Sequence, residues 1–270
     1  MDRQSRANAV DREMAARLLP ETALTALGRW WAEHGVAYAD GTPGAHAVHY
    51  TPAQWAHTSP WPAGLTSTSA TGDAVVSRAD VTSMVTEALQ RGSFRQALVA
   101  SYVWGKGKRG TRAGSGPATL HKILEADNLD TVLADAVTAL GRQGAREAYA
   151  VLHGKIAGFG PSFFTKFLYF AGQALSGEPA LKPLILDRVL SSRLRSLAIS
   201  VGQETGLDPD GSIAAWVWAD WDWTPHRYGV YLSFMHAAAR QVASTPAWPS
   251  HAAPDLLEYA LFNTPLNAAH

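Results

Sequence analysis

The chain has 270 residues, of which 47% are hydrophobic, so it can bury a sizeable core in one large domain or two small lobes. It has no cysteine, which excludes disulfides, thiol catalysis, thiolate zinc sites and cysteine-held iron–sulfur clusters. The 23 basic and 23 acidic side chains balance, which counts mildly against nucleic-acid binding unless the basic residues cluster locally. No apolar run approaches a membrane span and the N-terminus is not signal-like, so a soluble cytoplasmic protein is expected.

The N-terminal part combines two expected helices with a long irregular segment. Residues Val10 to Leu19 and Glu21 to His34 have apolar side chains at helical spacing. The stretch Tyr38 to Gly72 is rich in Gly, Pro, Ser and Thr, which is typical of a loop. Residues 1–76 are therefore predicted to form N-terminal helices and an irregular arm.

From Ser77 onward the pattern is regular and helical. Ser77 and Asp80 have the spacing of a capping box, followed by a helix to about Gln90. Further helices are expected over residues 93–105, 117–125, 129–140, 145–153, 185–199, 211–221 and 225–242. Because no stretch shows sustained period-two alternation, the predicted class is all-α, with a core over 77–245 and a C-terminal tail helix within 246–270 packing on it.

A tight glycine turn between two helices is the most informative segment. It lies in Ile-Ala-Gly-Phe-Gly-Pro-Ser-Phe-Phe-Thr-Lys over residues 156–166, after the expected helix 145–153. Gly158 and Gly160 lack side chains, so backbone N–H groups can approach a phosphate at the positive end of the following helix. Pro161 suits the first helical turn, where its missing N–H costs nothing.

A second signal is the aspartate in Leu-Ile-Leu-Asp-Arg-Val-Leu over residues 184–190. Asp187 follows three apolar residues and opens an amphipathic helix, so it is in part a helix cap. The same carboxylate can also act as a base for a water nucleophile or stabilise a developing sugar cation. The two roles are compatible.

Together these motifs resemble the helix-hairpin-helix DNA glycosylase superfamily, in which the hairpin precedes a Gly/Pro-rich loop and a catalytic aspartate. The loop here is Gly172 to Pro183, with Gly177 and Pro179. The pattern is also similar to a bacterial group described as 8-oxoguanine-glycosylase-like, and its specific part covers Leu152 to Leu194. The resemblance implies two helical lobes with a cleft between them. It also implies DNA binding through Gly158, Gly160 and Ser162, and catalysis by Asp187.

The sequence departs from the bifunctional members at the nucleophilic lysine. The position two residues after the last hairpin glycine is Ser162, as in the monofunctional branch, and its plainer interpretation is a first-turn helix residue. Lys166 follows one turn later on the same helix face, among aromatic residues that would disfavour its charged form and make its amine a better nucleophile. A snorkelling surface lysine is the equally weighted alternative.

Two weaker groups of candidates complete the sequence prediction. Lys106, Lys108 and Arg109 lie in a glycine-rich loop that resembles a dinucleotide motif but follows no strand, so phosphate contacts or plain solvation are the two interpretations. The last group is a late aromatic segment whose members are candidates for a base pocket, although a core role is favoured for most of it: Tyr228, Tyr231 and His236. Neither a metal site nor a cofactor is predicted.

The predicted activity is excision of a modified purine from double-stranded DNA by base flipping, with 8-oxoguanine favoured by the resemblance alone. AP lyase activity is added if Lys166 forms a Schiff base with the sugar. The expected protein is a nucleoid-associated cytoplasmic monomer that binds no membrane. Two alternatives stay open: a non-catalytic helix-hairpin-helix DNA-binding protein, and a defence glycosylase that acts on phage-modified bases.

Overall fold

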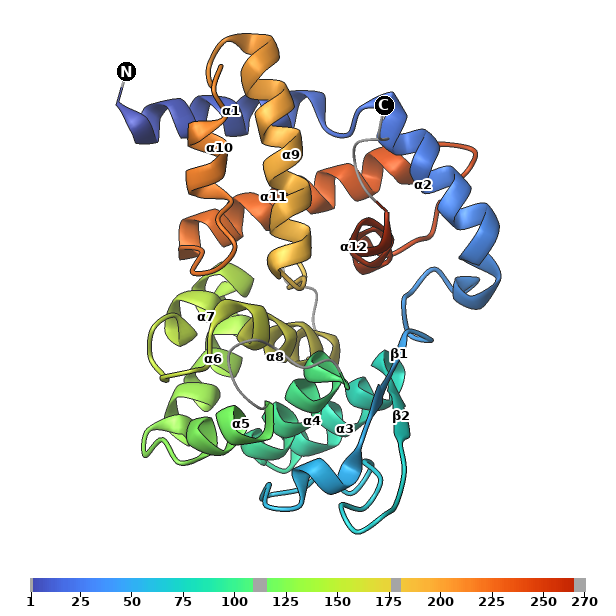
Figure 1. The fold of residues 1–270 in the computed structure, drawn as a ribbon, viewed down its shortest axis with the longest axis vertical. Helices are drawn as coiled ribbons and strands as arrows, with labels where there is room; N and C mark the ends of the chain where they lie inside the picture. Colours follow the sequence, from blue (N-terminus) through green and yellow to red (C-terminus); the bar gives the residue numbers. More distant parts are fainter. Residues whose placement is uncertain (1, 109–115, 176–180, 265–270) are drawn as a thin grey trace. The chain divides into compact units, whose positions relative to one another are not determined.

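The computed structural model describes residues 2–108, 116–175 and 181–264. Over these ranges the chain is mostly helical, with one small sheet, which confirms the predicted all-α class. Figure 1 shows the order of the elements along the chain. Arg109 and the loop residues Gly177 and Pro179 lie outside the described residues.

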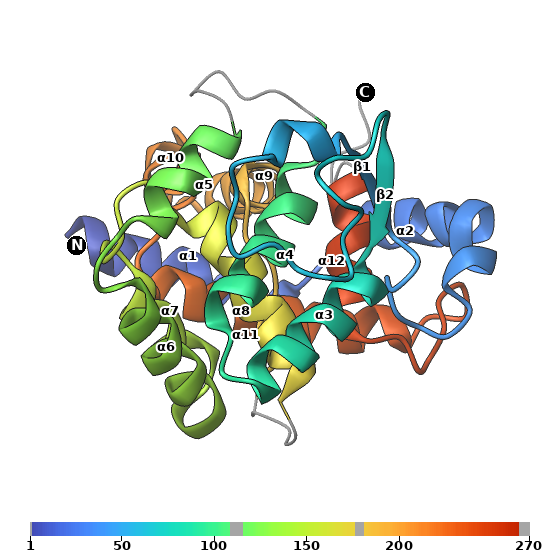
Figure 2. The same cartoon turned by 90° about the horizontal axis from the view of Figure 1, so that it is seen from below.

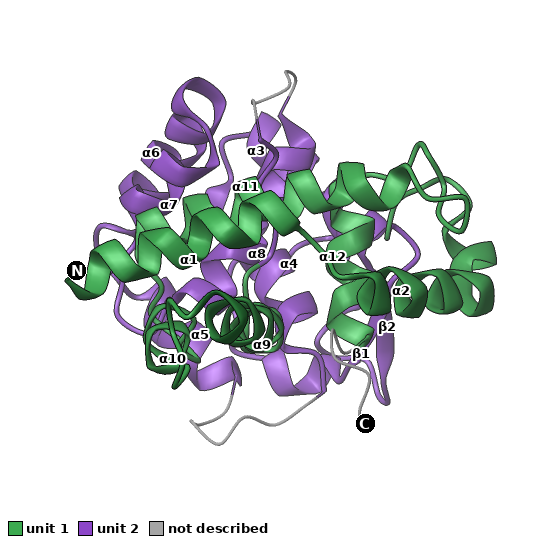
Figure 3. Cartoon of the chain, turned by 90° about the horizontal axis from the view of Figure 1, so that it is seen from above, with its two compact units in different colours: residues 1–43, 186–270 green, residues 44–185 purple. Residues whose placement is uncertain are grey.

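The chain forms two compact units, coloured separately in Figure 3. Unit 1 consists of residues 1–43 and 186–270, and unit 2 is the continuous segment 44–185. This division differs from the predicted boundaries at residues 76 and 245. The two ends of the chain belong to one unit, whereas a boundary drawn along the sequence separates them.

Unit 1 is built from helices of both chain ends. Its elements are α1 (Arg3–Arg17), α2 (Glu21–His34), η1 (Gly35–Tyr38), α9 (Arg188–Thr205), α10 (Ser212–Val217), α11 (Pro225–Ala243) and α12 (Pro254–Asn263). α1 packs on α9, α10 and α11. α12, within the region 246–270, packs on α2, α9 and α11.

Unit 2 carries the small sheet and the glycine turn. Its elements are β1 (Ala47–Tyr50), η2 (Pro52–Trp55), β2 (Ala74–Ser77), α3 (Arg78–Gln90), α4 (Phe94–Lys106), α5 (Gly116–Leu124), α6 (Leu129–Gln143), α7 (Ala145–Leu152) and α8 (Pro161–Ala174). α8 packs on α3, α4, α6 and α7, so the helix after the glycine turn lies at the centre of this unit.

The arm predicted to be irregular contains two short strands. β1 and β2 pair antiparallel, with Ala47 opposite Ser77 and Tyr50 opposite Ala74. β1 packs on α4 and β2 on α3, and Figure 2 shows the pair beside these helices. Strands of four residues are too short to give a sustained alternation, which is why the sequence pattern missed them.

A buried arginine fixes the start of this arm to the helices of unit 2. The guanidinium of Arg78 lies 5.1 Å from the ring centroids of both Trp104 and Tyr169, and its Nε donates to His46 Nδ1 over 3.3 Å. Burial, together with the charge of Arg78, lowers the pKa of His46 to about 3. The imidazole is therefore neutral at physiological pH and accepts the hydrogen bond.

Helix ends in both units follow from their capping residues. The helix expected over 185–199 begins at Arg188, because Asp187 is its N-cap, and it ends before Gly206, which has a φ of 71°. The capping box of Ser77 and Asp80 at α3 is confirmed. α11 begins at Pro225, after Thr224 accepts a hydrogen bond from the N–H of Arg227.

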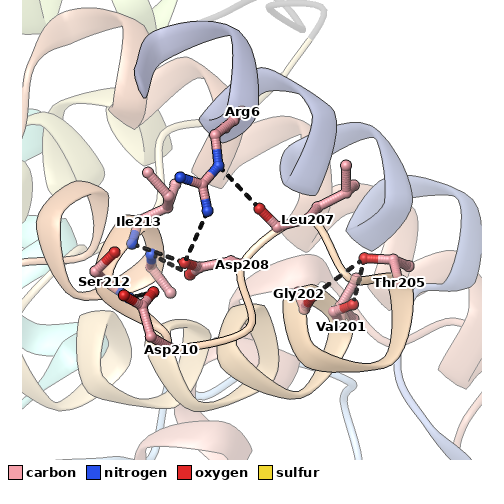
Figure 4. A network of polar contacts seen from close by, with 10 residues as sticks. Arg6, Val201, Gly202, Thr205, Leu207, Asp208, Asp210, Ser212 and Ile213 are labelled. Carbon is pink, nitrogen blue, oxygen red and sulfur yellow. Dashed lines mark hydrogen bonds and ion pairs between the residues drawn. The ribbon is translucent and has the colours of Figure 1, made fainter. Parts of the chain in front are cut away.

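The loop after α9 is held by a fully buried carboxylate (Figure 4). Asp208 accepts hydrogen bonds from the N–H groups of Ile213 (3.1 Å) and Ala214 (2.9 Å) at the start of α10. Arg6 of α1 lies 4.0 Å from Asp208 and donates to the carbonyl of Leu207 over 3.1 Å. The carboxylate therefore joins α1 to α10, and the N–H of Asp208 donates to the carbonyl of Gly202 on α9 over 3.0 Å.

We expect Asp208→Asn to lower the free energy of unfolding of unit 1 by about 2 kcal/mol, because the amide presents a donor to a buried backbone donor. Asp210→Asn is the matched control, since Asp210 is exposed in the same loop and bonds the N–H of Ser212. Denaturation followed by tryptophan fluorescence measures both. Equal losses in the two variants would contradict the prediction.

Candidate active site

The glycine turn of unit 2 depends on two residues in left-handed conformation. Gly154 and Gly158 have φ values of 70° and 80°, which side-chain-bearing residues rarely adopt. Ile156 and Phe159 of the turn are buried, and the N–H of Phe159 donates to the carbonyl of Ile156 over 3.1 Å. The turn is therefore anchored by its apolar side chains while its glycines reverse the chain.

Gly160 precedes α8 and differs from the other two glycines. Its φ of −79° suits any residue, and a Cβ there would meet nothing within 4 Å. Neither conformation nor packing therefore requires a glycine. No side chain caps α8, unlike α3 and α9, so its positive N-terminal end is open to an anion.

Lys166 is buried on α8, with 8% of its surface exposed. Its Nζ donates to the carbonyl of Ser162 over 2.6 Å, so the lysine reaches back to the position where the bifunctional pattern has its nucleophile. The amine lies 5.6 Å from the ring centroid of Phe163. A Cβ at Gly105 would stand 2.4 Å from the Cδ of Lys166, so this glycine makes room for the lysine stem.

An aromatic stack lies beside this lysine. The rings of Tyr102 and Phe163 are nearly parallel, with centroids 4.2 Å apart, and join α4 to the first turn of α8. Burial raises the pKa of Tyr102 to about 12, so its hydroxyl stays protonated as a donor. Lys166 is thus shielded from solvent beside an aromatic stack whose tyrosine hydroxyl is protonated.

The basic residues at the end of α4 and just after it differ in burial and in their partners. Burial lowers the pKa of the half-buried Lys106. The Nζ of Lys108 lies 2.6 Å from Asp73 of the arm, and this contact lowers the pKa of the Asp73 carboxyl. A DNA contact by Lys108 therefore requires this exposed ion pair to open, which costs little. Arg109 lies outside the described residues.

The two carboxylate oxygens of Asp187 differ in their hydrogen bonds. Oδ1 accepts hydrogen bonds from the N–H groups of Val189 (2.9 Å) and Leu190 (3.1 Å), which caps α9. Oδ2 accepts none from any residue that the structure describes, and the side chain is half-buried. The cap fixes the orientation of the carboxylate, and one oxygen stays available for chemistry.

The candidates for a base pocket lie inside unit 1. Tyr228 and Tyr231 of α11 are fully buried, with ring centroids 6.1 Å apart, and His236 is 8% exposed. Such burial favours the alternative interpretation, in which these side chains belong to the core. Their proposed contact with a base remains a prediction without support from their exposure.

Two further features of the described ranges bear on the type of protein. No described helix has the length and apolar character needed to span a bilayer. Within residues 2–108, 116–175 and 181–264, no three His, Asp or Glu side chains are grouped so that they could hold a metal ion.

Comparison with protein families assigns the chain to one of them. The model of a family described as "Putative 8-oxoguanine DNA glycosylase OGG-like protein" matches residues 41–262. The chain belongs to this family. Membership of the OGG-like family makes it a glycosylase of DNA, and the matched range includes both the hairpin and Asp187. Searches of curated proteins and of solved structures give no significant match.

Sequence reasoning missed a group of arginines that closely follow Asp187 in the OGG-like protein, and an exposed tryptophan. α9 presents the arginines at positions 188, 193 and 195, and Trp221 is 72% exposed in the loop before α11. The arginines follow Asp187 within two turns, which was a usable signal. The exposure of Trp221 was not readable, because five tryptophans lie between residues 216 and 248 and most of them are buried.

The two hairpin glycines give a matched pair of substitutions. We expect Gly160→Ala to leave the thermal midpoint within about 1 °C, because the new methyl meets no atom and φ is ordinary. Its DNA affinity should fall several-fold, because the methyl stands where a phosphate would approach. Gly158→Ala should instead destabilise by about 1 kcal/mol, because its φ is 80°.

Calorimetry and DNA-binding anisotropy separate the two effects. If the Gly160→Ala variant binds DNA as tightly as the wild type, the N-terminus of α8 takes no part in DNA binding.

Proposed function

We propose that this protein excises a modified purine, with 8-oxoguanine first among the substrates, from double-stranded DNA. The observation that carries the proposal is the match to the OGG-like family over residues 41–262. A base inside a duplex is inaccessible, so the target nucleotide leaves the stack before it reacts, at a cost of about a few kcal/mol. That cost is lower for a damaged pair, which adds selectivity.

In the proposed reaction Asp187 promotes departure of the base. As the N-glycosidic bond breaks, positive charge develops on the sugar, and the Oδ2 oxygen stabilises that charge or takes a proton from water. Water then adds to the sugar C1′, and the base leaves with a proton. The cap formed by Oδ1 supports this role, because it holds the carboxylate in one orientation without using both oxygens.

The proposal for Lys166 is a second, strand-cleaving step. Its amine, once deprotonated, attacks C1′, forms a Schiff base after the sugar ring opens, and loss of a C2′ proton expels the 3′-phosphate. Burial of Lys166 beside the ring of Phe163 supports this role, because desolvation favours the neutral amine. The contact with Ser162 supports it as well, since the amine lies close to the hairpin.

The decisive variant is Asp187→Asn. An amide oxygen caps a helix as well as a carboxylate does, so α9 should form and DNA binding should persist. Base excision should fall by at least about a hundredfold, because the negative charge near the sugar is lost. End-labelled duplexes with single modified bases, treated with hot alkali, report excision, and anisotropy reports binding.

The outcomes distinguish the proposal from its alternatives. Binding without excision of any base by the wild-type protein would favour a non-catalytic DNA-binding protein. Excision confined to phage-type modified bases would favour a role in defence. An Asp187→Asn variant with undiminished excision would show that another group performs the chemistry.

Lys166→Gln tests the lyase step separately. If Lys166 forms the Schiff base, borohydride should trap the wild-type protein on cleaved DNA. The variant should lose trapping while retaining alkali-revealed excision. Lys122→Gln is the control, because Lys122 is an exposed lysine of α5. Wild-type cleavage that always requires alkali, with no trapped complex, would make the enzyme monofunctional and assign Lys166 a structural role.

A further inference from the structure

The first two turns of α9 border a polar hollow on the surface of unit 1. Its volume is about 290 Å³, which exceeds that of a phosphate group, and its lining is rich in arginine. The residues that line it are Arg188, Val189, Ser192, Arg193, Arg195 and Asp220. Arg188 directly follows Asp187, so the hollow begins beside the candidate catalytic carboxylate.

The hollow has an excess of positive charge. Arg195 lies 3.1 Å from Asp220, so these two charges compensate one another. Arg193 donates to the carbonyl of Leu261 over 3.4 Å, a neutral partner, and partial burial lowers the pKa of its guanidinium. The exposed side chain of Arg188 makes no hydrogen bond or ion pair with any described residue. Two uncompensated guanidinium groups therefore face the hollow, and such groups bind phosphate well.

An exposed tryptophan stands in the loop that borders this hollow. The loop is fixed by Trp223, which is 2% exposed and donates to the hydroxyl of Ser191 on α9 and to the carbonyl of Ala219. The hydroxyl of Ser191 in turn donates to Ala219. Trp221 lies between these anchored residues and next to Asp220, and 72% of its surface is exposed. An anchored loop thus presents an exposed indole ring at the residue that follows Asp220, which lines the hollow.

We propose that this hollow and Trp221 form a strand-binding site for DNA, in which Arg188 and Arg193 hold a backbone phosphate and Trp221 stacks on an unpaired base. The inference rests on the proposed function, since it takes DNA as the substrate. It adds a binding site on unit 1 to the hairpin of unit 2.

The combination of groups identifies the ligand. Arginine pairs with phosphate oxygens regardless of base sequence, and indole rings stack on the face of any nucleobase. Inside an intact duplex the base faces are covered by neighbouring pairs. They become accessible in single strands, or where a nucleotide has left the stack, as base flipping requires. The site should therefore favour distorted or unpaired DNA over intact duplex.

The test compares three labelled probes by fluorescence anisotropy: an intact duplex, the same duplex with one stable tetrahydrofuran abasic analogue, and the single strand. Arg188→Ala should weaken binding to all three by roughly tenfold and reduce the slope of log affinity against log salt by about one. Trp221→Ala should weaken binding to the abasic duplex and the single strand by roughly tenfold, with little effect on the intact duplex. Trp221→Phe should restore part of the loss.

Two control variants come from the same unit. Trp216→Ala removes a second exposed tryptophan, which lies under Arg3 on α10, and Arg12→Ala removes an exposed arginine of α1. If Arg188→Ala and Trp221→Ala bind like these controls while the wild type binds and excises, the inference is overturned and the proposed function stands. If Trp221→Ala weakens all three probes equally, the stacking on an unpaired base is overturned. If the wild type neither binds a probe nor excises a base, the proposed function itself fails.

Discussion

The shared carboxylate of Asp187 connects the fold to the chemistry. One oxygen accepts two backbone N–H groups and starts α9, and the other is left without a partner among the described residues. Because the helix holds the side chain through Oδ1, the direction of the second oxygen is fixed as well. The positions of the arginines on the first turns of α9 depend on the same cap, because it fixes where the helix begins. Whatever displaces Asp187 therefore disturbs the helix start, the candidate catalytic group and the adjacent basic hollow together.

In the hairpin of unit 2, neighbouring glycines also have different structural roles. Gly158 and Gly160 lie two residues apart, yet the first is needed for its backbone conformation and the second leaves the helix N-terminus open. Gly105 makes room for the stem of Lys166, which then reaches the carbonyl of Ser162. A lysine one turn later than the bifunctional pattern can in this way occupy a comparable place. Gly105 on α4 thus provides the space that the Lys166 side chain needs.

The sequence predicted those features that depend on local patterns. Helical periodicity, the capping box at Ser77 and the cap at Asp187 are written in a few neighbouring residues, and the structure confirms them. The pairing of β1 with β2, and the packing of α1 on α11, depend on residues far apart in the chain, so no local pattern reveals them. The burial of individual side chains was also not predictable from the sequence. Lys166 and Trp221 have similar aromatic neighbours in sequence, yet one is buried and the other exposed.

The division of unit 1 between both chain ends has a consequence for biosynthesis. Arg17 pairs with Glu204, and the backbone of Leu19 bonds the side chain of Gln241, so residues 1–43 find these partners only after the whole of unit 2 has been synthesised. Unit 2 is continuous and leaves the ribosome complete much earlier. The first two helices must therefore wait, with their apolar faces uncovered, while a whole compact unit forms behind them. The order of synthesis therefore places the assembly of unit 1, including α9 and Asp187, after the synthesis of unit 2.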